Sequence, residues 1–202
     1  MEVERAMADL AEVRDRLATI QRFPGYSGPA AVCSGAFAII AGFIQHEAAP
    51  WPSSASQYAT YVAVWLICLG ASLTINYGAI AWWFLSANRH GREQSKTVGV
   101  TILPSLIMGA VLSVALIDHG IIWMLPGVWC ISYAVGLFAS RAMVPPGVMS
   151  IAALFAVMGA LLLLTNQPTI ALSWWIMPLA FGVGQAAIGI SIWQEQLREV
   201  QE

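Results

Sequence analysis

Six long apolar stretches alternate with short polar segments along the chain. They cover about Pro29 to Gln45, Tyr58 to Ser86, Val98 to Ile117, Gly120 to Ser140, Gly147 to Leu164, and Thr169 to Ile192. Each is about 17 residues or longer, enough for an α-helix rising about 1.5 Å per residue to cross a hydrocarbon core of about 30 Å. The stretches lack the alternation of barrel strands. The pattern therefore predicts an all-α membrane protein with six transmembrane helices.

The basic residues divide the connections between these stretches into two groups. Lys and Arg occur only at Arg5, Arg14, Arg16, Arg22, Arg89, Arg92, Lys96, Arg141 and Arg198, in four of the polar segments. The other three connections, around His46 to Gln57, Asp118 to His119 and Thr165 to Pro168, contain none. Because cytoplasmic loops carry an excess of Lys and Arg, both termini are predicted to be cytoplasmic. We expect an integral protein of a bacterial-type inner or plasma membrane.

The segment before the first stretch has the periodicity of an amphipathic helix. An aliphatic stripe recurs at spacings of three and four residues, and its members are Ala6, Leu10, Val13, Leu17 and Ile20. Interfacial helices usually have strongly basic polar faces and aromatic anchors, whereas this polar face is mixed, so a helix–helix contact is favoured. The partner would be a second copy of the chain, another protein, or the tail. The alternative is a helix that only rests on its own bundle.

Proline and glycine set the limits of that segment and give the domain organisation. Residues 1–22 are predicted to form the cytoplasmic helix, and residues 23–28, with the prolines and glycines around them, a hinge that prevents its continuation. Residues 29–193 form the transmembrane bundle, and residues 194–202 a cytoplasmic tail. Small residues at Ala31, Gly35, Ala38 and Gly42, and at Gly182 and Ala186, predict close packing of the first and sixth helices with each other or with a neighbouring protomer.

An internal repeat favours three tandem helical hairpins. Met108 to Ala110, followed by a W-x-x-P pattern from Trp123 to Pro126, is echoed by Met158 to Ala160, followed by the same pattern from Trp175 to Pro178. The third–fourth and fifth–sixth stretches therefore read as duplicated hairpins, and the first pair extends the scheme more weakly. The alternative is chance similarity among apolar helices.

Two sets of polar residues are candidate sites. Ser72, Asn76, Tyr133 and Gln185 lie in the inner halves of the even-numbered stretches, where they would either form a polar substrate pocket or hydrogen-bond neighbouring helices. His46, Glu47, Asp118 and His119 are the ionisable residues assigned to the outer side. They could hold a divalent metal or relay a proton if the helix ends meet, or simply mark the water boundary.

Composition and missing motifs narrow the function. Apolar residues make up 58% of 202 positions and charged residues 10%, against roughly a quarter charged in soluble domains, and no basic patch supports nucleic-acid binding. No stretch contains the residues of the common membrane hydrolases and transferases, and the sequence leaves the cofactor unknown. We therefore expect a non-enzymatic interaction, regulatory or accessory subunit that docks through its N-terminal helix, with the lipid bilayer and a protein partner or second copy as its partners. The alternative is a small-solute, metal or proton transporter or channel built from the hairpin repeats.

Overall fold

Five helices in the described part of the chain are long and apolar enough to cross a membrane. The computed structural model describes Met7 and residues 25–86 and 89–201, so the predicted stripe from Ala6 to Ile20 lies outside the described residues. The five are α2 (Gly28–Ala48), α3 (Ala55–Ser86), the apolar part of α4 (Arg89–Asp118), the short η1 (Ile122–Met124) continued by α5 (Leu125–Ala139), and α6 (Pro146–Leu164). The described residues contain no strand. The all-α class is confirmed for the described residues, and five of their helices have the length and apolar composition that spanning a membrane requires.

The last apolar stretch is not one regular helix. It contains the short α7 (Pro168–Ala171), a turn around Ser173, the π-helix η2 (Pro178–Val183) and the start of α8 (Gly184–Gln201). Pro178 begins η2, directly after the helical residues Ile176 and Met177. The predicted tail continues α8 as far as Gln201. Whether this stretch also crosses the membrane remains a prediction.

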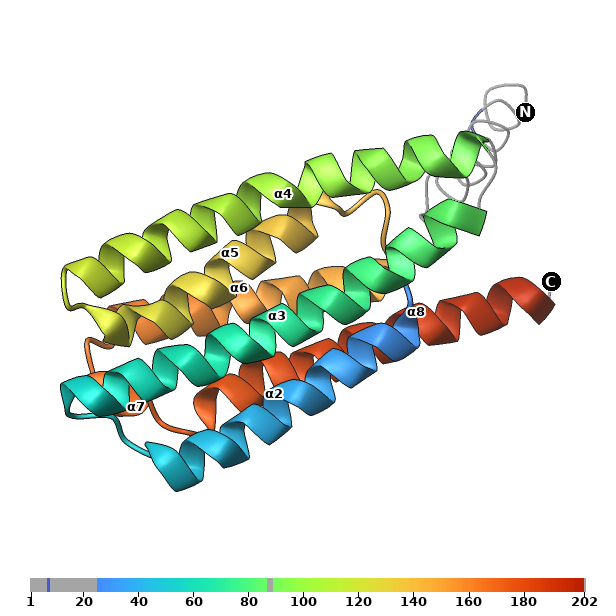
Figure 1. The fold of residues 1–202 in the computed structure, drawn as a ribbon. Helices are drawn as coiled ribbons and strands as arrows, with labels where there is room; N and C mark the ends of the chain where they lie inside the picture. Colours follow the sequence, from blue (N-terminus) through green and yellow to red (C-terminus); the bar gives the residue numbers. More distant parts are fainter. Residues whose placement is uncertain (1–6, 8–24, 87–88, 202) are drawn as a thin grey trace.

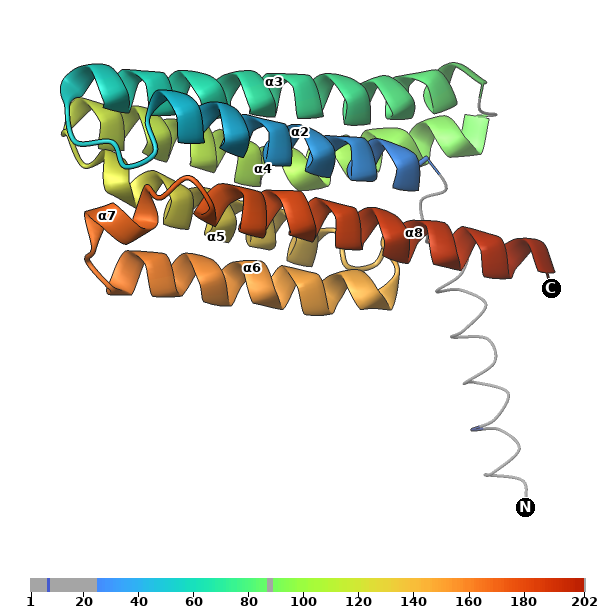
Figure 2. The ribbon, with the colours of Figure 1, turned by 90° about the horizontal axis from the view of Figure 1, so that it is seen from below.

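The helices run side by side along one axis, and chain neighbours are not always the closest packed (Figure 1). α2 packs against α3 on one side and against η2 and α8 on another, while α5 packs between α4 and α6. By contrast, α3 and α4 contact each other little, and α6 packs more against α5 than against α8. Seen from below, α3 and α6 lie on opposite sides of the bundle (Figure 2). α2 therefore connects α3 to the last helical segment, and α5 connects α4 to α6.

The described residues form three hydrophobic clusters, of which the smallest joins α6 to α7 and the turn after it through Leu162, Ala171 and Ile176. The other two are larger. One lies among α2, α5, α6 and α8 and includes Cys130, Phe155 and Ile188. The other lies among α2 and α3 and the turn before η2, and includes Tyr61 and Trp65, with Trp129 of α5 packed against it. Since α2 and α5 contribute to both regions, the cores form a continuous interior.

Glycines on α2 face the last helix at backbone contact distance. A Cβ atom added to Gly35 would lie 2.6 Å from the carbonyl oxygen of Gly182, and one added to Gly28 would lie 2.7 Å from that of Gly189. Two turns beyond Gly35 on α2, Gly42 faces the ring of Pro178. The predicted close packing of the first and last apolar stretches is confirmed within one chain. Small residues allow this approach because no side chain separates the backbones.

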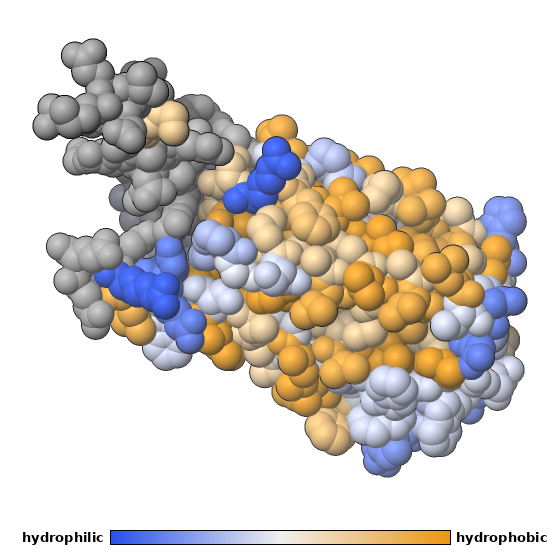
Figure 3. Space-filling view, turned by 180° about the vertical axis from the view of Figure 1, so that it is seen from behind, coloured by the Kyte–Doolittle hydropathy of each residue, from blue (hydrophilic) through white to orange (hydrophobic). Residues whose placement is uncertain are grey.

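The outer surface of the bundle is apolar around its middle. Figure 3 shows hydrophobic side chains over the central part of one face and hydrophilic ones toward the ends. On α4, Val100 and Val114 are each at least 70% exposed. A soluble monomer rarely exposes so large an apolar surface, and lipid is the solvent that suits it. The fold thus indicates an integral membrane protein.

Candidate functional site

The predicted inner polar residues form two hydrogen-bonded groups that join different helices. Asn76 Nδ2 of α3 donates to Ser34 Oγ of α2 at 2.6 Å and to the carbonyl oxygen of Ser72 at 2.9 Å. Ser34 Oγ in turn donates to the carbonyl oxygen of Ala30 at 3.0 Å. Ser72 therefore takes part through its backbone. Ser34, which sequence reasoning missed, is the partner that ties α3 to α2.

The second group joins α8 to α5. Gln185 Nε2 donates to Tyr133 Oη at 2.8 Å. The Tyr133 ring meets Phe155 edge-on with a centroid separation of 4.9 Å, and Phe181 lies 5.6 Å from Tyr133 and 5.1 Å from Phe155. The π-helix η2 supplies Phe181 to this aromatic cluster. The hydrogen bond between Gln185 and Tyr133 thus lies beside the aromatic rings of Phe155 and Phe181.

One turn of α2 lies between the two groups. Ser34 belongs to the first group, and its neighbour Gly35 faces the second, because a Cβ atom added to Gly35 would be 3.4 Å from the Cβ atom of Gln185. The four predicted residues therefore gather on either side of the Ser34–Gly35 turn. Asn76, Tyr133 and Gln185 use side-chain polar atoms to bond other helices. Such contacts orient helices in lipid, where an unpaired polar group is costly.

A third hydrogen-bonded group, which sequence reasoning missed, lies near the other end of α2. Gln45 has 0% of its surface exposed; its Nε2 donates to the carbonyl oxygen of Leu172 at 2.8 Å, and Trp65 Nε1 donates to its Oε1, also at 2.8 Å. One amide thus ties α2 to α3 and to the segment after α7. The sequence signal was a lone Gln closing an apolar stretch.

A fourth group joins α4 to α5. Trp129 Nε1 donates to Ser113 Oγ at 2.7 Å, and Ser113 Oγ donates to the carbonyl oxygen of Gly109 at 2.6 Å. Tyr61 lies parallel to Trp129, with an interplanar angle of 3° and ring centroids 6.5 Å apart. The hydroxyls of Tyr61 and Ser132 are buried without a hydrogen-bond partner among the described residues.

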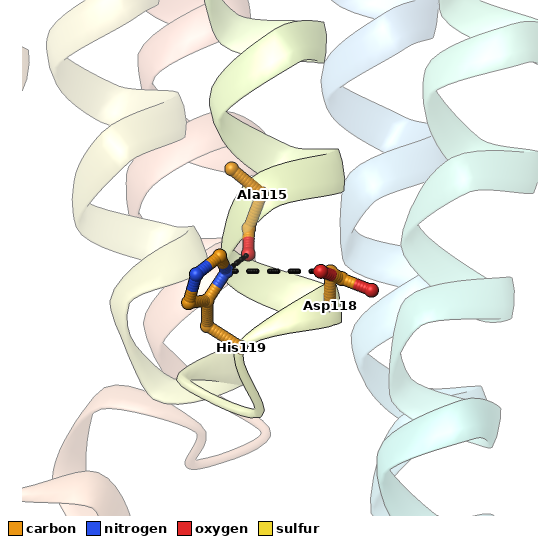
Figure 4. Close-up of polar contacts among 3 residues, drawn as sticks. All are labelled: Ala115, Asp118 and His119. Atoms are coloured by element: carbon orange, nitrogen blue, oxygen red, sulfur yellow. Dashed lines mark hydrogen bonds and ion pairs between the residues drawn. The ribbon is translucent and has the colours of Figure 1, made fainter.

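The outer ionisable residues do not form one cluster. His119 Nδ1 lies 2.8 Å from the carbonyl oxygen of Ala115 and 3.9 Å from Asp118 Oδ2, and the two side chains are 69% and 84% exposed (Figure 4). The His46 ring instead lies against Trp174, with centroids 4.7 Å apart. Within the described ranges, no three His, Cys, Asp or Glu side chains are placed to hold a metal ion. Each imidazole has its own neighbour, so the geometry adds no support for the metal role.

The segment entering α2 forms a further group at the end of the bundle where α8 ends. Gln196 Nε2 of α8 donates to the carbonyl oxygen of Tyr26 at 3.1 Å. Burial raises the pKa of the Tyr26 phenol to about 12, partly offset by a hydrogen bond with Ser140, and the nearby Tyr77 raises it slightly further. The phenol is therefore neutral at physiological pH.

Comparisons with protein-family models, with curated protein sequences and with solved structures found no match to this chain. The function is therefore argued from the arrangement of its residues.

Proposed function

We propose that this chain is a non-enzymatic accessory or regulatory subunit of the membrane, which docks to a protein partner or a second copy through its N-terminal helix. The observation that supports this proposal is how the interior polar groups are used. Asn76, Gln185 and Gln45 each hydrogen-bond a group on another helix or segment of the chain. A bundle whose buried and half-buried amides hold its own helices together is suited to present a surface rather than to process a substrate.

The proposal includes six spans with both termini in the cytoplasm. Gly42, Gly35 and Gly28 of α2 face Pro178, Gly182 and Gly189 in turn, so the last helical segment follows α2 along its length. The end of α3, the start of α4, the end of α5 and the end of α8 all lie at one end of the bundle (Figure 2). The basic residues of the described segments at that end are Arg89, Arg92, Lys96, Arg141 and Arg198, which supports assigning it to the cytoplasmic side.

The docking surface we propose is the aliphatic stripe of the N-terminal helix. Leu10 and Leu17 lie two turns apart on it, and burying each would contribute about 1.5 to 3 kcal/mol. Changing both to Asp should therefore weaken association by about 100-fold or more. The measurement is the oligomeric mass and the set of proteins retained after purification in a mild detergent.

A matched control distinguishes the effect of losing the aliphatic stripe from the effect of adding negative charge. The double variant Ala11→Asp and Ala18→Asp has the same added charge and the same spacing of seven residues, on another face of the predicted helix. It should associate like the wild type. Unchanged association in the Leu10→Asp, Leu17→Asp variant would contradict docking through the stripe. Loss of expression of that variant alone would show instead that the helix packs on its own bundle.

A second candidate, transport of a small solute, has one observation in its favour. The π-helix η2 places Phe181 beside the Tyr133–Gln185 pair, and π-helical turns occur frequently at functional sites. Uptake or release of a small polar solute by proteoliposomes, abolished by Gln185→Leu but not by the stripe variant, would favour transport over docking.

A further inference from the structure

An open hollow lies on the outward face of α2, near the end of that helix. It has a volume of about 500 Å³ and is lined by Phe43, Ile44, Glu47 and Ala48. Phe43 is 59% exposed and Ile44 is 53% exposed, and the side chains of Glu47 and Ala48 are exposed as well. The hollow therefore combines two large apolar side chains with one carboxylate, which lies about one turn further along the helix.

The length of α2 gives these side chains different depths in a bilayer. The helix has 21 residues, and at about 1.5 Å per residue it is about 30 Å long, which is the thickness of a hydrocarbon core. Glu47 is its second-last residue, which places the carboxylate at the level of the lipid headgroups. The neighbouring His46 ring lies against Trp174, and tryptophan is enriched at that level. Phe43 and Ile44 then lie at the level of the acyl chains.

The charge around the hollow indicates which headgroup fits it. At the end of the bundle where α2 ends, the connections between helices contain no Lys or Arg, and their acidic residues are Glu47 and Asp118. Within the residues that the structure describes, the Glu47 carboxylate has no hydrogen bond or ion pair. Such a carboxylate attracts a cation and repels a headgroup whose only charge is a phosphate. It also accepts hydrogen bonds from a primary ammonium group, which a quaternary ammonium group cannot donate.

We propose that this hollow binds a phospholipid whose headgroup carries a primary amine. The ammonium group pairs with Glu47, and an acyl chain of the same lipid lies against Phe43 and Ile44. The small side chain of Ala48 leaves room for the headgroup beside the carboxylate. This inference requires that α2 crosses the membrane, and it does not depend on docking through the N-terminal helix.

Photocrosslinking identifies the lipid that lies against this face. A benzophenone amino acid replaces Ile40, which is 53% exposed and one turn before Ile44. The full chain is placed in nanodiscs with equal amounts of phosphatidylethanolamine, phosphatidylcholine and phosphatidylglycerol that have the same acyl chains, and mass spectrometry identifies the captured lipid. Capture of phosphatidylethanolamine should exceed that of either other lipid by about threefold, a modest preference because exposed ion pairs are weak.

A matched position and three variants show what causes the preference. A benzophenone at Val157 of α6, which is 56% exposed on a helix that ends without a carboxylate, should capture the three lipids equally. Glu47→Gln keeps the shape of the side chain and removes its charge, so capture at Ile40 should become equal as well. Asp118→Asn should leave the preference unchanged. Phe43→Ala should reduce the preference, because the acyl chain loses its largest contact.

Equal capture of the three lipids at Ile40 in the otherwise unchanged chain would overturn the proposal, and so would an unchanged preference in Glu47→Gln. A crosslink from Ile40 to a second copy of the chain would also overturn it, because the face would then be a protein interface. The Leu10→Asp, Leu17→Asp variant should keep the lipid preference. Loss of association in that variant together with equal lipid capture would therefore reject the lipid site and leave the docking proposal in place.

Discussion

At the residue scale, the behaviour of this protein depends on a few amides and indoles whose hydrogen bonds cross between helices. Gln45 is the clearest example, because it is fully buried and bonds the Trp65 indole and the Leu172 carbonyl oxygen as well as the carbonyl oxygen of Ala49 in its own segment. On the protein surface these groups could exchange partners with water, but Gln45 is enclosed by protein and cannot. The Gln45 side chain therefore fixes how the end of α2 lies relative to α3 and to the segment after α7.

The variant Gln45→Leu should be destabilised by about 1 to 2 kcal/mol, because it leaves the Trp65 N–H and the Leu172 carbonyl oxygen unpaired while keeping most of the volume. Reversible unfolding in detergent, followed by tryptophan fluorescence, measures the change. Gln194→Leu, at an exposed position of α8, is the control. If the two variants unfold alike, the Gln45 contacts do not contribute to stability.

Sequence reasoning found Asn76, Tyr133 and Gln185 but not Gln45 or Ser34. The reason is that spacing along a helix shows which residues share a face, whereas a hydrogen-bond partner lies on another helix whose rotation is unknown. Asn76 belongs to the predicted polar set, as a pocket residue or a helix–helix contact, and Ser34 does not, although the two are partners. The polar set was therefore recognisable, and its pairing was not.

Among the helices, the glycines distinguish faces that meet another helix from faces that meet none. Gly28, Gly35 and Gly42 of α2 each meet the last helical segment, whereas a Cβ atom added to Gly70 or Gly78 of α3 would meet nothing within 4 Å. The sequence predicted the first contact from its small residues. It did not predict that the partner would include a π-helix, because apolar content reports burial in lipid and not how a helix is wound.

Gly35→Ala should therefore destabilise the protein, by about 1 to 3 kcal/mol, because the added methyl group meets a backbone oxygen that cannot rotate away. Gly70→Ala, the same change on α3, should have an effect near zero or slightly stabilising. Thermal unfolding of both variants in the same detergent compares their stabilities with that of the wild type. Equal effects would mean that the α2–α8 contact is looser than described.

At the scale of the whole molecule, the helices could be predicted but their arrangement could not. Length and apolar content are enough to identify α2 to α6, because crossing lipid requires about 20 apolar residues. In a soluble bundle the apolar face would also show which side is buried. Here α4 is apolar on its lipid side as well as its protein side, and its sequence therefore does not show that it packs on α5 rather than on α3.

The orientation of the whole molecule gives a direct prediction. Cysteines placed at Ser54 and Asn166 should react with an impermeant reagent added to intact cells, and one at Gln94 should react only after lysis. The basis is that Lys and Arg are absent from the segments around Ser54 and Asn166 and present around Gln94. Labelling at Gln94 in intact cells would reverse the orientation, and protection at Asn166 would contradict the crossing of α6, which ends two residues before it.

The pairing of α2 with α8 has a consequence for how the protein is made. Gly28 meets Gly189, a residue synthesised about 160 positions later. At about 5 to 20 residues per second, the ribosome takes roughly 8 to 30 seconds to produce it. During that time the glycine face of the first helix has no partner from its own chain, so it depends on lipid or on the insertion machinery for cover. A nascent chain stalled before Gly184 should therefore crosslink at Gly35 to that machinery, and the crosslink should disappear once α8 has been released.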